Sequence, residues 1–128
     1  MQKRRILVVD DEPSITRLLK LNLELTGLYE VAEAHSGSEA MAKGPDFKPD
    51  LMLLDIIMPD VDGGALTGQM LGNEHLAEVP IIFLTAAITR DEACETNGFI
   101  GNYPFLAKPI RMEELLTEIK KALHTKKE

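Results

Sequence analysis

The chain has 128 residues, of which 45% are hydrophobic and 27% charged, the composition of an ordinary globular domain. Its net charge of −7 disfavours a surface for nucleic acid or anionic lipid, because both need clustered positive charge. The lone cysteine, Cys94, excludes an internal disulfide and a thiolate zinc site, and the sequence shows neither a membrane-spanning run nor a signal peptide. We therefore expect one small acidic domain over residues 1–128, located in the cytoplasm.

Short apolar runs alternate with helical patterns along the first half of the chain. The run at residues 6–9 is typical of a strand covered on both faces, and the acids and proline of residues 11–13 favour a helix start. That helix is expected to end at Gly27, after which residues 29–34 alternate as a strand does. Residues 36–39 have the spacing of a capping box, which predicts the start of a second helix.

The same alternation continues in the second half. Residues 51–54 and 81–84 predict two more buried strands, residues 105–106 a short strand, and residues 112–123 a helix with one apolar face. Two further helices are expected over residues 65–73 and 91–98. Five strands that alternate with helices predict an α/β fold, with a mainly parallel sheet and helices on both of its faces.

Polar side chains follow four of the predicted strands. They are Asp10 and Asp11 after the first strand, Asp55 after the third, Thr85 after the fourth and Lys108 after the fifth. The carboxyl ends of parallel strands lie at one edge of a sheet, where such folds bind their ligands. We therefore expect three carboxylates, a hydroxyl and an ammonium to meet there.

This set of groups indicates a particular chemistry. Neighbouring carboxylates repel one another, so they need protons or a cation, and oxygen ligands of this kind suit Mg²⁺. A carboxylate can also attack phosphorus, and Asp55 is the natural nucleophile because it lies between the acidic pair and Lys108. Lys108 and Thr85 could then offset the charge on the transferring phosphoryl oxygens.

Each of these residues also has an ordinary explanation when it is taken alone. Asp10 and Asp11 could be acids at a helix start, Asp55 a turn residue, Thr85 a strand-end residue and Lys108 a surface lysine. Together, these explanations require four coincidences at four strand ends. The functional interpretation is therefore preferred.

Four stretches of the sequence, in this order and at these spacings, match one known family. They are residues 6–13 (ILVVDDEP), 49–63 (PDLMLLDIIMPDVDG), 80–86 (PIIFLTA) and 105–109 (FLAKP). From residue 6 to about residue 123, the chain resembles the receiver domain of two-component response regulators. The resemblance implies a flavodoxin-like (βα)5 fold, which is a doubly wound parallel sheet with strand order 2-1-3-4-5.

The resemblance also implies roles for the acidic residues. By this match, Asp55 accepts a phosphoryl group from a sensor histidine kinase or a phosphotransfer protein. Asp10, Asp11 and Asp55 hold Mg²⁺, or Mn²⁺, together with the backbone carbonyl of Ile57.

A conformational switch is implied as well. Thr85 and Lys108 bind the phosphoryl group, and Phe105 stands where the family has a rotating aromatic residue. As Thr85 moves towards the phosphoryl group, Phe105 turns inward, and the face made by the fourth helix, the fifth strand and the fifth helix changes shape. The Lys108–Pro109 peptide bond is usually cis in the family. An ordinary core position is the alternative for Phe105.

Three functions are compared on this basis. A phosphoryl-accepting receiver is favoured. A degenerate receiver that binds a partner without phosphorylation is the alternative. It is favoured slightly by the glycines and proline of residues 98–104 and opposed by the intact Asp11, Asp55, Thr85 and Lys108. A phosphatase of the haloacid-dehalogenase type would need a second acid where this chain has Ile57.

We accordingly expect no enzymatic activity beyond the domain's own phosphorylation and dephosphorylation. The expected partner is a histidine kinase or phosphotransfer protein, and no direct contact with nucleic acid or membrane is expected. The sequence leaves open the output partner or C-terminal output domain, and whether phosphorylation causes formation of a homodimer.

Overall fold

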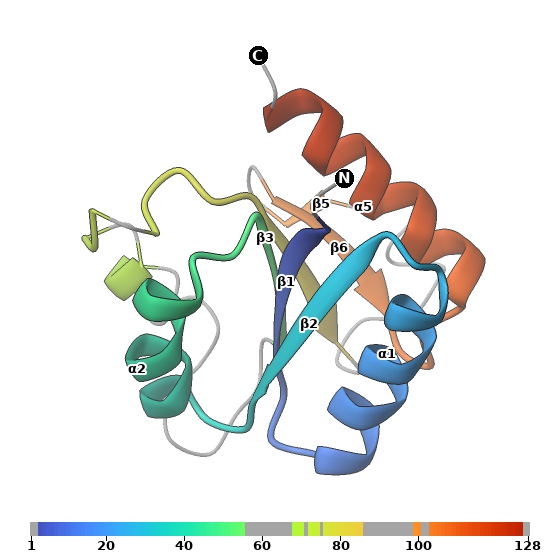
Figure 1. Cartoon of the computed structure of the whole chain (residues 1–128), viewed down its shortest axis with the longest axis horizontal. Helices are drawn as coiled ribbons and strands as arrows, with labels where there is room; N and C mark the ends of the chain where they lie inside the picture. Colours follow the sequence, from blue (N-terminus) through green and yellow to red (C-terminus); the bar gives the residue numbers. More distant parts are fainter. Residues whose placement is uncertain are drawn as a thin grey trace.

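Parallel strands form the centre of the molecule, and helices pack on both faces of the sheet (Figure 1). The computed structural model describes residues 3–55, 68–70, 72–74, 76–85, 99–100 and 103–126. The strands are β1 (Arg4–Val9), β2 (Tyr29–Ala34), β3 (Leu51–Asp55), β4 (Ile81–Thr85), β5 (Phe99–Ile100) and β6 (Tyr103–Ala107). The helices are α1 (Pro13–Leu25), α2 (Gly37–Phe47) and α5 (Met112–Lys126).

The order of the strands confirms the predicted fold class. The sheet runs β2-β1-β3-β4-β6-β5, and the first five strands of this order are parallel to their neighbours. Because β6 is the fifth parallel strand along the chain, the parallel part has the flavodoxin-like order 2-1-3-4-5. All its strands therefore end at the same edge, shown at the bottom of Figure 1 for β1 and β3.

Strand β5 is an addition that the sequence pattern did not predict. It has two residues and pairs antiparallel with the first two residues of β6, Phe99 opposite Pro104 and Ile100 opposite Tyr103. A pair this short carries no hydrophobic period that a sequence could show. The same addition explains why β6 begins at Tyr103, two residues before the predicted strand.

Strand β1 shows why the apolar runs are strands. Ile6, Leu7, Val8 and Val9 are all fully buried. Ile6 and Val8 belong to the core cluster shared with α1 and α5, whereas Leu7 and Val9 belong to the cluster on the side of α2. A strand directs alternate side chains to opposite faces, so an uninterrupted apolar run fills two cores at once.

The predicted starts of α1, α2 and α5 agree with the structure, while α5 continues to Lys126, beyond the predicted residue 123. Pro13 is the first residue of α1, and Gly27 follows the helix in the left-handed region at φ 77°. At the start of α2, Ser36 Oγ accepts a hydrogen bond from Glu39 N at 3.0 Å, as the capping box predicts. The Glu39 carboxylate accepts its own bond from His35 N, one residue earlier than the box requires.

The two remaining predicted helices fall largely outside the described residues. Residues 91–98 lie outside them altogether, and of residues 65–73 the structure describes a helical turn at 68–70 followed by a turn. Within the described part of the chain, no helix combines the length and apolar character needed to cross a bilayer.

The central position of β3 generates a stability prediction. Leu53 is fully buried in this strand, so Leu53→Ala should lower the free energy of unfolding by about 2–5 kcal/mol, because it removes buried methyl groups and leaves a cavity. Leu25, at the end of α1, is 83% exposed, and Leu25→Ala should change the free energy of unfolding by about 0.5 kcal/mol or less. Urea denaturation measures both, and equal effects of the two substitutions would contradict this assignment of the core.

Candidate functional site

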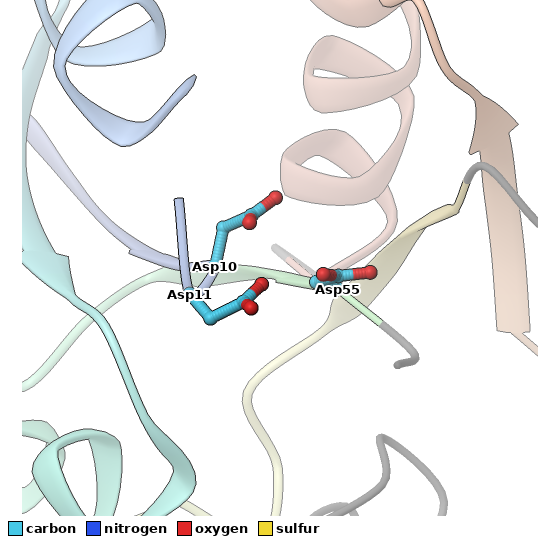
Figure 2. Close-up of side chains that lie close together, drawn as sticks. All are labelled: Asp10, Asp11 and Asp55. Carbon is cyan, nitrogen blue, oxygen red and sulfur yellow. The ribbon is translucent and has the colours of Figure 1, made fainter. Parts of the chain in front are cut away.

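Three carboxylates meet at the carboxyl edge of the sheet (Figure 2). Asp10 and Asp11 follow β1, and Asp55 is the last residue of β3. Because β1 and β3 are neighbouring parallel strands, these residues lie side by side, and each offers an oxygen within 4.8 Å of the others. The predicted convergence of the acidic residues is thus what the structure shows.

Asp10 is fully buried, and hydrogen bonds hold both its backbone and its carboxylate. Its backbone N–H donates to Ala34 O at the end of β2, at 3.0 Å. Its Oδ1 accepts a hydrogen bond from Glu12 N at 3.0 Å, and its Oδ2 accepts one from Lys108 Nζ at 2.6 Å. A buried carboxylate needs such partners, since an unpaired charge in a low-dielectric interior is very costly.

Lys108 is the cation of the site. It follows β6, its side chain is only 12% exposed, and its Nζ lies 3.6 Å from Asp55 Oδ2 as well as 2.6 Å from Asp10 Oδ2. Burial alone would lower the pKa of Lys108. The hydrogen bond that Lys108 donates to Asp10 and the charges of Asp10, Asp55 and Glu12 outweigh that effect, so the pKa of this ammonium lies above its usual value.

The charges of this set fit a divalent cation. Among the described residues, three carboxylates face one ammonium, which gives the edge of the sheet a formal excess of about two negative charges. Asp11 is exposed to solvent and has no hydrogen bond or ion pair among the described residues. Hard oxygen ligands on a partly hydrated rim are the donors that Mg²⁺ or Mn²⁺ prefers, so Asp10, Asp11 and Asp55 could hold either ion.

The structure places the other predicted residues less completely. Thr85 ends β4 and pairs with Ala107 in β6, one residue before Lys108, but its side chain lies outside the described residues. Ile57 lies outside them too. Phe105 is 2% exposed and belongs to the core cluster on the α2 side. Its role as a rotating switch stays a prediction, whereas the expected cis Lys108–Pro109 peptide is confirmed.

Two supports of the site are backbone groups that the sequence analysis missed. The Glu12 amide and the Ala34 carbonyl both bind Asp10. Backbone groups carry no residue-specific signal, so nothing in the amino-acid pattern could have identified them.

The family model described as "Response regulator receiver domain" matches residues 6–120. The chain belongs to this family. Among curated relatives, this receiver domain is 35% identical over 120 residues to the "DNA-binding dual master transcriptional regulator RpaA" of Synechocystis, with 93% of this chain and 48% of RpaA covered. It is 40% identical over 120 residues to the "Transcriptional regulatory protein ResD" of Bacillus subtilis, with 93% of this chain and 48% of ResD covered. The chain therefore spans about half the length of these relatives.

Solved structures agree with this assignment of the receiver domain. The chemotaxis protein CheY4 of Vibrio cholerae superposes with a TM-score of 0.80 at 28% identity, covering 94% of this chain and 99% of CheY4. A putative response regulator from Chloroflexus aurantiacus gives a TM-score of 0.80 at 30% identity, covering 96% and 99%.

The repulsion among the three carboxylates predicts that the effect of Asp11→Asn on stability depends on whether metal is bound. In EDTA, Asp11→Asn should raise the free energy of unfolding of the receiver domain, because it removes one of three mutually repelling charges. Mg²⁺ should raise the free energy of unfolding of the wild type more than that of this variant. The increase for the wild type is about 2.7 kcal/mol where the Mg²⁺ concentration exceeds the dissociation constant a hundredfold. Urea denaturation with and without Mg²⁺ measures both effects.

The control is Asp46→Asn, because Asp46 is an exposed carboxylate of α2. It should respond to Mg²⁺ as the wild type does. Equal stabilisation of wild type and Asp11→Asn by Mg²⁺ would contradict the metal assignment.

The raised pKa of Lys108 generates a second prediction. A group whose folded-state pKa is raised stabilises the fold fully below its unfolded value of about 10.4, and this contribution is lost as pH rises through the folded-state pKa. In EDTA, Lys108→Met should therefore be less stable than wild type at pH 8, and the difference should shrink above about pH 10.4. Lys121→Met, at a 69% exposed lysine, should show no such change. If Lys108→Met lowers the free energy of unfolding by the same amount at every pH, the ion pair is not the source of the stabilisation.

Proposed function

We propose that this chain is a phosphoryl-accepting receiver of a two-component phosphorelay and that Asp55 is the phosphoacceptor. The observation that carries the proposal is the position of Asp55, with Lys108 Nζ at 3.6 Å and the carboxylates of Asp10 and Asp11 within 4.8 Å. A nucleophilic carboxylate is thereby placed beside a fixed cation and a set of metal ligands. This is the combination that phosphoryl transfer to a carboxylate requires.

The reaction follows from these groups. An oxygen of Asp55 attacks the phosphorus of a phosphohistidine on the kinase or phosphotransfer protein, a P–O bond forms, the P–N bond breaks, and the imidazole leaves with the bonding pair and takes up a proton. Lys108 supplies positive charge for the transferring phosphoryl oxygens. Asp10, Asp11 and Asp55 would hold a divalent ion, for which the Ile57 carbonyl is proposed as a further ligand, and that ion would supply further positive charge.

The domain is proposed to catalyse only its own phosphorylation and dephosphorylation. Thr85 is proposed to bind the phosphoryl group, and Phe105 to respond by turning. In the described conformation Phe105 is packed beside its strand partner Phe83 in the core cluster on the α2 side, so its turning would change the packing around β6. A two-state change of this kind typically couples the two sites by about 1–3 kcal/mol.

The output is proposed to be transcriptional. The curated relatives named above are about twice as long and carry names of transcriptional regulators, one of them described as DNA-binding. With a net charge of −7, the receiver domain itself is not expected to contact nucleic acid, so a further domain or a partner protein would do so. The phosphorelay is proposed to operate in the cytoplasm.

Intact mass after incubation with acetyl phosphate and Mg²⁺ tests the assignment. The wild type and Asp46→Asn should each gain one phosphoryl group, whereas Asp55→Asn and wild type in EDTA should gain none. Because an acyl phosphate is a reactive anhydride, the added mass should be lost in mild base. No gain by a wild type that binds Mg²⁺ would contradict the proposal and favour a module that acts without phosphorylation.

A further inference from the structure

Thr16, in the first turns of α1, is fully buried, and its hydroxyl meets three polar groups. Its Oγ1 lies 2.7 Å from Glu33 Oε1, 2.9 Å from His35 Nε2 and 3.1 Å from Pro13 O. A hydroxyl has one proton, and the short contact to a carboxylate favours donation to Glu33. With its proton on Nε2, His35 can then donate to Oγ1, and the hydroxyl serves both as donor and as acceptor.

These contacts continue into α2. His35 N donates to Glu39 Oε1 at 2.7 Å, while Lys43 Nζ pairs with Glu39 Oε2 at 2.8 Å and donates to Glu33 O at 2.7 Å. We call Thr16, Glu33, His35, Glu39 and Lys43 the Thr16 cluster. The cluster joins α1, the end of β2 and the start of α2 by side-chain hydrogen bonds and ion pairs.

The Thr16 cluster lies next to the hydrogen bonds that anchor the two ends of the loop containing Asp10 and Asp11. At one end of this loop, Asp10 N donates to Ala34 O, the residue between Glu33 and His35. At the other end, Glu12 O accepts the amides of Ile15 and Thr16, at 3.0 and 3.3 Å, in the first turn of α1. The Thr16 hydroxyl therefore ties together β2 and α1, the two elements that hold the loop of Asp10 and Asp11.

We propose that Thr16 is a positioning residue for the divalent-metal site, and that its hydroxyl keeps the Asp10–Asp11 loop in the arrangement that binds the ion. This inference rests on the proposed function, which includes that site. The three carboxylates repel one another, so in the absence of metal the loop tends to move apart unless its anchor points are held. Thr16 acts through the backbone and does not itself touch the carboxylates of the site.

Two substitutions of Thr16 separate the effect of its hydroxyl group from the effect of its side-chain shape. Thr16→Val keeps the volume of the buried side chain and removes the hydrogen bonds, whereas Thr16→Ser keeps the hydroxyl and removes a methyl group. Partners that orient metal ligands typically change affinity by a factor of 10–100. Because Thr16 acts indirectly, we expect Thr16→Val to weaken Mg²⁺ binding by about tenfold, the lower end of that range, and Thr16→Ser to bind close to wild type.

A matched control lies at the other end of the same helix. Thr26 Oγ1 donates to Leu23 O at 2.7 Å, three residues back, as Thr16 Oγ1 lies 3.1 Å from Pro13 O. Thr26→Val removes this local bond and the bond that Leu28 N donates to Thr26 Oγ1, without touching the Thr16 cluster. It should leave the dissociation constant of Mg²⁺ unchanged. Glu33→Gln, which weakens the acceptor of the hydroxyl, should weaken Mg²⁺ binding in the same direction as Thr16→Val.

Calorimetric titration with Mg²⁺ and amide hydrogen exchange in EDTA together test the inference. The exchange of the Asp10 and Glu12 amides, both hydrogen-bonded in the loop, should be faster in Thr16→Val than in wild type or Thr26→Val. The role of the hydroxyl would be overturned if Thr16→Val bound Mg²⁺ and exchanged its amides as the wild type does. It would also be overturned if Thr16→Ser bound Mg²⁺ as weakly as Thr16→Val. Failure of the wild type itself to bind Mg²⁺ would instead contradict the proposed function, and with it the metal site on which this inference rests.

Discussion

The ion pair of Lys108 with Asp10 and Asp55 is the interaction on which the functional edge of this molecule depends. It joins the residue after β6 to the ends of β1 and β3, and both carboxylates are almost completely removed from solvent, with side-chain exposures of 0% and 7%. One ammonium cannot neutralise two buried carboxylates and the exposed Asp11 beside them. The edge therefore keeps an excess of negative charge, which is consistent with a divalent-metal site. The phosphoryl transfer proposed for Asp55 would depend on a cation that offsets this charge.

The topology of the sheet brings these groups together. Residues 10, 55 and 108 are far apart in the sequence, and their proximity follows from the parallel order β2-β1-β3-β4-β6. Strands β1, β3, β4 and β6 each end with a polar residue at or directly after their last position. The apolar runs that bury the strands on both faces therefore also position the site, since a shift of one residue in β1 or β3 would turn its terminal carboxylate away.

Much of this could be predicted from the amino-acid sequence because the signals are local. Apolar runs, Pro13, Gly27 and the capping box at Ser36 each act within a few residues, and the motif around Asp55 is continuous in the chain. What could not be predicted depends on non-local or very short features. Strand β5 has two residues, the preference of Lys108 for Asp10 over Asp55 depends on distances of 2.6 and 3.6 Å, and the Thr16 cluster joins residues of three elements.

The proposed function requires the carboxylates at this edge to bind one divalent ion. Anomalous scattering from crystals of the wild-type protein equilibrated with Mn²⁺ would locate the ion directly. We expect a single strong peak between the carboxylates of Asp10, Asp11 and Asp55, and we expect this peak to be absent from crystals of Asp11→Asn. A wild-type crystal with Mn²⁺ elsewhere, or with none at this edge, would contradict the proposed metal site.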